Sequence, residues 1–264
     1  YLTDVFTEEA VHFIQKNQHR PFFLFLSHIT PHTPLQTIEK YSRRYEHISD
    51  KRARIYASMV ASLDDSVGRI VEELESLGLS ENTLIVFASD NGCAGYIEGA
   101  CSNAPYSGFK RYHQEGGIRI PLIMSWDNFL PRGLTYKQPV ITLDLYSTFV
   151  AAAGHAGFYS IDSVNLIPFI KKEVNSAPHK YLYWRSGPTY AIRDERWKLM
   201  QYSVAPYTAR DLGNDGRLTP PKGGWPHELS SEKITLLYDL KADPSEQNNL
   251  ADSHPEIVKR LTTE

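Results

Sequence analysis

Two kinds of hydrophobic pattern alternate along the first two thirds of the chain. Runs of apolar residues that end in polar ones occur at 21–28, 84–89 and 120–126. Such short runs are typical of strands buried on both faces of a parallel sheet. Other segments repeat apolar residues every three or four positions, which predicts amphipathic helices. These segments are residues 7–17, with Thr7 as the N-cap, 50–78 and 141–154.

Past residue 177 the pattern changes to alternation of apolar and polar positions. Residues 181–203 read "YLYWRSGPTYAIRDERWKLMQYS", which predicts antiparallel hairpins with a turn at Asp194. A loop rich in Pro and Gly is expected at 205–225, followed by a strand and a terminal helix. The fold class predicted is therefore α/β, with a mainly parallel sheet sandwiched by helices in residues 1–177 and a smaller antiparallel α+β subdomain in residues 178–264.

Polar residues follow the predicted parallel strands. The run "LIVFAS" ends in Asp90, Asn91 and a glycine, and His32 lies shortly after the run at 21–28. Ligands of such sheets bind at the carboxyl ends of the strands, so we expect these side chains to lie near one another. Carboxylate and amide oxygens suit calcium or magnesium, although Asp-Asn-Gly is also a common turn signal.

A glycine-flanked loop, "GFKRYHQEGG", leads into the run at 120–126 and contains Lys110. An ammonium beside a bound cation would neutralise anionic oxygens of a substrate, whereas a solvated lysine is the plain alternative. His32 could hold or deliver a proton near neutral pH. Arg111, His113 and Arg119 are expected to add positive charge to the same loop.

Composition narrows the function classes. The chain has 264 residues and a net charge of −3, with no basic tract suited to nucleic acid. It has no apolar run long enough for a membrane span and does not begin with Met, so it reads as a piece of something longer. Its two cysteines, Cys93 and Cys101, lack the spacing of a zinc site, and a disulfide or two thiols are equally compatible with the sequence.

Four pieces of sequence in this order resemble the type I sulfatases of the alkaline-phosphatase-like superfamily, along nearly the whole chain. They are "PFFLFLSHITPHTPLQ", "YASMVASLDDSVGRIVEELESLGLSENTLIVFASDNG", "GFKRYHQEGGIRIPLIMSW" and "LLYDLKADPSEQNNLA".

The resemblance implies hydrolysis of a sulfate ester of a sugar or an aryl group. By this analogy Asp90 and Asn91 belong to a calcium (or magnesium) site, while Lys110 and His32 contact the sulfate. It further implies that the antiparallel subdomain, with Trp184, Arg185 and Arg193, lies beside the cleft and helps to select the substrate.

The nucleophile of these enzymes is a formylglycine made from the Cys or Ser of a C-x-P-x-R or S-x-P-x-R motif. Neither "CAGYI" at Cys93 nor "CSNAP" at Cys101 matches it, and the upstream Asp pair has no counterpart. The chain is thus expected to be the second half of a sulfatase and inactive alone. An exposed sheet edge would favour association with the missing N-terminal half or with another copy.

Two other readings stay open on the sequence. One is a phosphoesterase or phosphonate hydrolase of the same superfamily, and the other is a non-catalytic fragment that at most binds an anionic glycan. By family analogy the location would be the periplasm, the cell exterior or the lysosome, all compatible with a disulfide.

Overall fold

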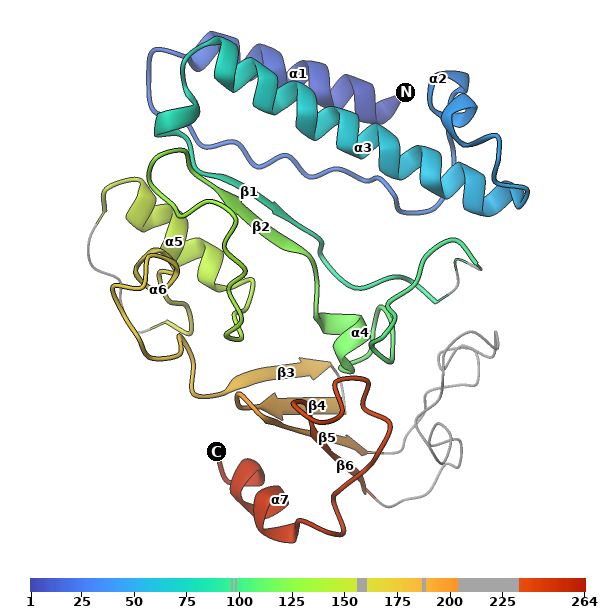
Figure 1. Ribbon diagram of the computed structural model, residues 1–264, viewed down its shortest axis with the longest axis vertical. Helices are drawn as coiled ribbons and strands as arrows, with labels where there is room; N and C mark the ends of the chain where they lie inside the picture. The colour runs from blue at the N-terminus through green and yellow to red at the C-terminus, as the bar shows by residue number, and fades with distance from the viewer. Residues whose placement is uncertain (96, 98, 156–160, 187–188, 204–232) are drawn as a thin grey trace. The chain divides into compact units, whose positions relative to one another are not determined.

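The computed structural model describes all residues except 96, 98, 156–160, 187–188 and 204–232 (Figure 1). The loop predicted at 205–225 therefore lies outside the described residues. The chain divides into two compact units. Unit 1 comprises Tyr1–Ile85, Ile97–Ser102 and Trp126–Phe129, and unit 2 comprises Val86–Tyr96, Asn103–Ser125 and Leu130–Glu264.

Unit 1 is built on two long helices that lie side by side, α1 (Leu2–Asn17) and α3 (Lys51–Ser76) (Figure 1). The helix predicted at 50–78 is confirmed: Asp50 caps α3 by accepting a hydrogen bond from Ala53 N at 2.7 Å, and Gly78 follows its end with a φ of +68°. Shorter helices complete the unit, namely α2 (Glu39–Ser42), η1 (Arg43–Tyr45) and η2 (Ser80–Asn82).

The start predicted for α1 at Thr7 is wrong, because the helix begins at Leu2. Thr7 lies inside the helix, where its buried hydroxyl donates to Thr3 O at 2.7 Å. A threonine whose hydroxyl bonds the carbonyl four residues earlier does not cap a helix, so the N-cap prediction mistook an interior residue for a terminal one.

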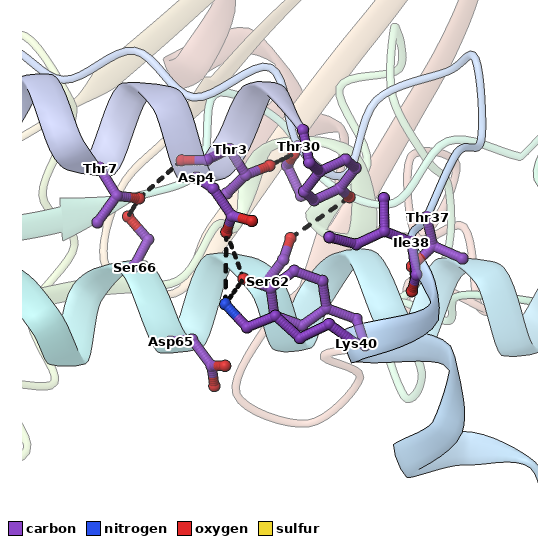
Figure 2. Close-up of polar contacts among 12 residues, drawn as sticks. Thr3, Asp4, Thr7, Thr30, Thr37, Ile38, Lys40, Ser62, Asp65 and Ser66 are labelled. Atoms are coloured by element: carbon purple, nitrogen blue, oxygen red, sulfur yellow. Dashed lines mark hydrogen bonds and ion pairs between the residues drawn. The ribbon is translucent and has the colours of Figure 1, made fainter.

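A hydroxyl seam, formed by Thr3, Thr7, Ser62 and Ser66, lies along α1 and α3, and the bond between Thr7 and Ser66 joins the two helices (Figure 2). All four side chains are buried. Thr7 Oγ1 lies 2.6 Å from Ser66 Oγ, and Thr3 Oγ1 lies 2.7 Å from the hydroxyl of Thr30. The seam satisfies polar groups that would otherwise be buried without partners.

The strand predicted at 21–28 is not formed in the described part of the chain. The segment instead runs in an extended course along the two helices of unit 1 (Figure 1). Its burial alternates as in a strand: Phe22 packs edge-to-face on Phe13 at 5.9 Å, whereas Phe23 is 65% and Phe25 79% exposed. The apolar pattern was right, but a strand also needs a neighbouring strand to pair with.

The strands predicted at 84–89 and 120–126 are confirmed. They form β1 (Ile85–Ala88) and β2 (Leu122–Ser125), which pair in a two-stranded sheet. The helix predicted at 141–154 is α5 (Asp144–Ala152), followed by Gly154 with a φ of +78°. Two single-turn helices also belong to unit 2, α4 (Glu115–Ile118) and α6 (Ile167–Ile170).

A four-stranded antiparallel sheet lies in the C-terminal part of unit 2, as the alternating pattern predicted. Its order is β3 (Leu182–Ser186), β4 (Thr189–Arg193), β5 (Trp197–Ser203) and β6 (Lys233–Asp239). The turn predicted at Asp194 joins β4 to β5, and its carboxylate accepts hydrogen bonds from Arg196 N and Trp197 N.

The two faces of this sheet have different neighbours. Helix α7 (Pro255–Thr262) covers one face, where Leu261 packs against Leu199 and Leu237. The opposite face contains Met200 and Tyr238. Because side chains alternate along a strand, Lys198 of β5 lies on the same face as Met200. We call it the inner face.

No helix among the residues that the structure describes is both long and apolar enough to cross a bilayer.

Candidate active site

The polar turn after β1 contains the two predicted metal ligands. Asp90 is exposed and Asn91 is half-buried. Asn91 Nδ2 donates to Gly92 O at 3.0 Å, and Ser89 Oγ donates to Asn91 O at 2.8 Å. Because the amide nitrogen of Asn91 bonds within the turn, its Oδ1 is the atom that would coordinate a cation.

The turn after β1 packs directly on the glycine pair that precedes β2. Gly92 N donates to Gly117 O at 3.0 Å, and a Cβ placed on Gly92 would lie only 1.8 Å from Gly116 O. No side chain could be accommodated at this approach without moving the backbone. Gly92 is therefore needed for this contact, whereas a Cβ on Gly116 or Gly117 would meet the loop before them, at 2.5 Å from Ser107 O and 2.2 Å from Tyr112 O.

The loop that contains Lys110 is bonded to the same turn. Lys110 N donates to Cys93 O at 3.0 Å, and the Lys110 side chain is half-buried. The next residue, Arg111, has a φ of +85°, a left-handed conformation that is uncommon for residues other than glycine. The structure thus brings together the backbone segments that contain Lys110 and the Asp90–Asn91 pair, as expected for neighbouring strand ends.

Asn103 is a site residue that the sequence reasoning missed. Its Oδ1 accepts from Cys93 N at 2.8 Å, and its Nδ2 donates to Gly108 O at 3.0 Å. It therefore bridges the turn after β1 to the loop that contains Lys110. An asparagine in a loop of small residues gave no signal of this role.

The expectation that His113 adds positive charge to the loop is wrong near neutral pH. Burial lowers the pKa of His113 to about 4, and the charge of Lys198 acts in the same direction. The imidazole is therefore neutral at pH 7. The cationic side chains of this loop are Lys110, Arg111 and Arg119, and the last also lies over the ring of Tyr106 at 4.6 Å.

Four charged side chains meet beneath the loop, at the inner face of the sheet. We call Glu115, Arg193, Lys198 and Glu246 the buried ion cluster. Lys198 Nζ lies 3.1 Å from Glu115 Oε1 and 2.8 Å from Glu246 Oε1. Arg193 Nη1 donates to Glu115 Oε2 at 3.1 Å. Lys198 and Glu246 are fully buried, and Glu115 is 1% exposed.

The pKa values of the two carboxyl groups of the buried ion cluster are shifted in opposite directions. Burial opposes ionisation of Glu115, but the charges of Lys198 and Arg193 outweigh it and lower the pKa of Glu115. Burial raises the pKa of Glu246; Lys198 opposes this change and the negative charge of Glu115 adds to it. The "EGG" and "DPSEQNN" pieces supplied both carboxylates, yet the sequence did not indicate that they meet.

The three predicted substrate-binding residues do not share one face of the sheet. Trp184 packs against the cluster of Ala191, Met200 and Tyr238 on the inner face. Arg185 is exposed and, one residue along β3, lies on the opposite face. Arg193 is 14% exposed and engaged with Glu115. Their part in substrate binding stays a prediction.

His32 belongs to unit 1. It is exposed, and its Nδ1 lies 2.8 Å from Thr33 O. Its backbone N–H donates to Ile29 O at 2.8 Å, which closes a turn directly after the segment at 21–28. Its role as a sulfate-contacting residue also stays a prediction.

Both cysteines, Cys93 and Cys101, are disulfide-bonded and neither is free. This resolves the alternative between a disulfide and two thiols. In the described part of the chain, no three or more His, Cys, Asp or Glu side chains are grouped to hold a metal ion. The Asp90–Asn91 pair falls outside this grouping, because it has one carboxylate and the side chain of Asn91 is an amide.

The sequence of this chain is similar to those of known proteins. A sequence model of the family described as Sulfatase matches residues 1–155. Steryl-sulfatase of Homo sapiens is 33% identical over 270 residues, which cover 94% of this chain and 44% of that protein. N-acetylgalactosamine-6-O-sulfatase of Bacteroides thetaiotaomicron is 29% identical over 283 residues, covering 99% of this chain and 50% of that protein.

Among solved structures, Ps i-CgsB in complex with k-i-k-neocarrahexaose is similar with a TM-score of 0.80 and 31% sequence identity. The similarity covers 99% of this chain and 53% of that one. The chain thus spans about half the length of the curated relatives and solved structures that it matches.

Proposed function

This chain belongs to the sulfatase family, and from that premise we propose that it supplies part of the active site of an enzyme that hydrolyses a sulfate ester to an alcohol and sulfate. The fold is the alkaline-phosphatase-like fold of type I sulfatases, present in part. The observation that carries the proposal is the bonding of the Lys110 loop to the turn of Asp90 and Asn91 through Cys93 and Gly92.

We propose Asp90 and Asn91 as ligands of a calcium (or magnesium) ion. Adjacent carboxylate and amide oxygens at an accessible turn are hard donors of the kind these ions prefer, so the donor chemistry fits. A bound cation would supply positive charge that stabilises negative charge developing on the ester oxygens. Asp90 would hold the cation with a full charge, and Asn91 would add a neutral oxygen.

Two further residues would act on the ester itself. The Lys110 ammonium would lie against the sulfate oxygens and stabilise their charge in the transition state. His32 would position the ester or donate a proton to the departing oxygen. Lys110 is well suited to its role because the backbone on either side of it is fixed by hydrogen bonds.

The nucleophile lies outside this chain in our proposal. Neither cysteine occurs in a C-x-P-x-R motif, and each is held in a disulfide. A formylglycine on the missing N-terminal half would supply the attacking oxygen in the complete enzyme. We therefore propose that the isolated chain is inactive.

The exposure of Phe23 and Phe25 supports the same division. We propose that a segment of the missing N-terminal half packs against residues 21–28 and covers these two side chains; self-association would cover them less completely. The boundary between residues 177 and 178 also stays a proposal: the first part would contain the site loops, and the second would help to select substrate.

A sulfated sugar or an aryl sulfate is the proposed substrate class. The similar Ps i-CgsB structure contains an oligosaccharide, and the sulfatase from Bacteroides thetaiotaomicron is named for a sulfated amino sugar. Trp184, Arg185 and Arg193 are the residues we propose to influence this choice. A periplasmic, extracellular or lysosomal location is proposed on family analogy and is consistent with the disulfide.

The proposal is tested in a polypeptide that joins this chain to the missing half. Asp90→Ala should abolish metal-dependent hydrolysis of a generic aryl sulfate, and Lys110→Ala should lower kcat/KM by about 100-fold or more. Aryl phosphate and phosphonate monoesters, assayed in parallel, distinguish a sulfatase from a phosphoesterase or phosphonate hydrolase. Undiminished activity of both variants would refute the assigned roles. Absence of all three activities in the unaltered protein would favour the non-catalytic reading.

A further inference from the structure

Burial of the ion cluster costs desolvation free energy. A lysine with no exposure and two carboxylates beside it loses nearly all of its hydration, and ion pairing at best offsets that loss. Apolar residues of similar size usually give equal or greater stability at such positions. The presence of Lys198 between Glu115 and Glu246 therefore calls for a role besides stability.

The contacts of Glu246 indicate that role. Its Oε2 accepts two hydrogen bonds, one from Glu115 N at 2.6 Å and one from Ser107 Oγ at 3.3 Å. These donors are the two ends of the loop 107–115, and Lys110 lies between them. A single carboxylate oxygen thus closes this loop at its base, and Gly116 N adds a bond to Ser107 O at 2.7 Å.

The backbone of Glu246 is itself in an unfavourable conformation. Its φ is +54°, in the left-handed region that glycine adopts readily and other residues seldom do. This conformation costs about 1 kcal/mol or more, and residues that adopt it are concentrated at functional sites. Here the side chain reaches the base of the Lys110 loop.

Lys198 fixes Glu246 in turn. Its ammonium lies 2.8 Å from Glu246 Oε1, which leaves Oε2 directed at the loop, and 3.1 Å from Glu115 Oε1. Arg193 holds the same Glu115 carboxylate from the neighbouring strand. The antiparallel sheet therefore anchors both the loop base and the carboxylate that closes it.

We propose that Glu246 and Lys198 are positioning residues for Lys110: through the base of the loop 107–115 they hold its ammonium where a sulfate ester binds. This inference rests on the proposed function, because it assumes that Lys110 contacts the ester. It gives the closing "DPSEQNN" piece of the sequence a part in the active site, although it lies more than 130 residues beyond Lys110.

The test is a double-mutant cycle in the polypeptide that joins this chain to the missing half, with a generic aryl sulfate as the substrate. Glu246→Gln should lower kcat/KM by about 10- to 100-fold, since a displacement of the order of 1 Å has effects of this size. In a Lys110→Ala background the same change should have less than a twofold effect, because Glu246 acts through Lys110. Lys241→Met removes an exposed lysine paired with Glu195 in the same unit and should change kcat/KM less than twofold.

A milder variant covers the case in which Glu246→Gln does not fold. Ser107→Ala removes one hydroxyl at the loop base and should lower kcat/KM by about 3- to 10-fold, again only when Lys110 is present. Folding of every variant is checked by its near-ultraviolet circular dichroism.

The outcomes separate the two levels of the proposal. If Lys110→Ala is inactive while folded Glu246→Gln and Ser107→Ala retain full activity, the positioning role is overturned and the proposed function stands. If the effects of Glu246→Gln and Lys110→Ala multiply, Glu246 acts independently of Lys110 and the inference is wrong. If Lys110→Ala itself is fully active, the role assigned to Lys110 is wrong and the inference fails with it. The proposed function fails only if the unaltered polypeptide does not hydrolyse the sulfate ester.

Discussion

At the scale of single residues, the most constrained positions are the glycines where two loops touch. Gly92 has no room for a Cβ because Gly116 O would lie 1.8 Å away, and both partners are backbone. Gly68, in the middle of α3, offers a matched comparison, because a Cβ added there would meet no other atom within 4 Å.

Replacing Gly92 by Ala should lower the free energy of unfolding by about 1 to 3 kcal/mol or more, because the backbone must shift to make room. Gly68→Ala should instead raise it by roughly 0.5 to 1 kcal/mol, since alanine favours the helix and fits without contact. Chemical denaturation of the chain measures both. Equal stability of the two variants would contradict the close approach.

His113 predicts a dependence of stability on pH. Its folded pKa of about 4 lies below its ordinary value of 6.5, so the unfolded chain takes up the proton first as the pH falls. Stability should therefore be unaffected by this group above about pH 6.5 and decline as the pH falls toward 4, by at most roughly 3 kcal/mol.

Comparison of the unaltered chain with His113→Gln isolates this contribution, because Glu246 and the other acids titrate in both proteins. The free energy of unfolding, measured between pH 7 and pH 4, should fall less steeply in the variant. Parallel curves for the two proteins would show that burial of His113 does not disfavour its charged form.

The residue-scale assignments show what sequence alone could supply. Asp90, Asn91 and Lys110 were recognisable because strand-end polar residues have a characteristic place in the pattern, and the structure bonds their segments together. Asn103 was not recognisable, because a loop asparagine that bonds to backbone groups leaves no periodic signal. The meeting of Glu115 with Lys198 was not, because the two residues are 83 positions apart.

At the scale of elements, patterns of period two and 3.6 predicted most of the helices and strands correctly. The segment at 21–28 was the failure, and its cause is physical: the pattern reports burial, whereas a strand is defined by its hydrogen-bonded neighbour. The same segment leaves Phe23 and Phe25 exposed on one side while Phe22 packs on α1.

The exposed aromatic side chains of Phe23 and Phe25 should promote association of the isolated chain. Replacing Phe23 and Phe25 together by Ser should weaken any concentration-dependent association by about tenfold or more, because two large apolar surfaces are removed. Val60→Ser, at an exposed position of α3, is the control and should have little effect. Sedimentation velocity over a range of concentrations measures the association of both variants. If they associate equally, Phe23 and Phe25 are not part of the contact between chains.

At the scale of the whole molecule, the chain has the fold elements of a sulfatase but about half the length of its relatives. Its motifs predicted the family and the absence of a nucleophile within the chain. They could not predict which sulfate ester the proposed enzyme would bind, because that choice depends on side chains of a complete cleft.

The isolated chain should show no hydrolysis of a generic aryl sulfate, and activity should appear on co-refolding with a separately expressed N-terminal half that contains a formylglycine. The reason is chemical, since the attacking group and the remaining cation ligands would come from that half. A chain with Asp90→Ala, co-refolded in the same way, is the control and should stay inactive. Metal-dependent hydrolysis by the isolated chain would show that the N-terminal half is not needed for the attacking group and the remaining cation ligands.

The hydroxyl seam between α1 and α3 has one further consequence. The hydrogen bond between Thr7 and Ser66 requires a short distance between the two hydroxyls, so it is satisfied at a single axial offset of the two helices. This bond therefore fixes the axial position of α1 relative to α3. It also fixes where the end of α1 lies, from which the chain continues toward His32. Inserting one residue between Thr3 and Thr7 would rotate one of their hydroxyls by about 100° relative to the other. The two hydroxyls could then no longer lie on the same side of α1, and the axial position would lose one of its constraints.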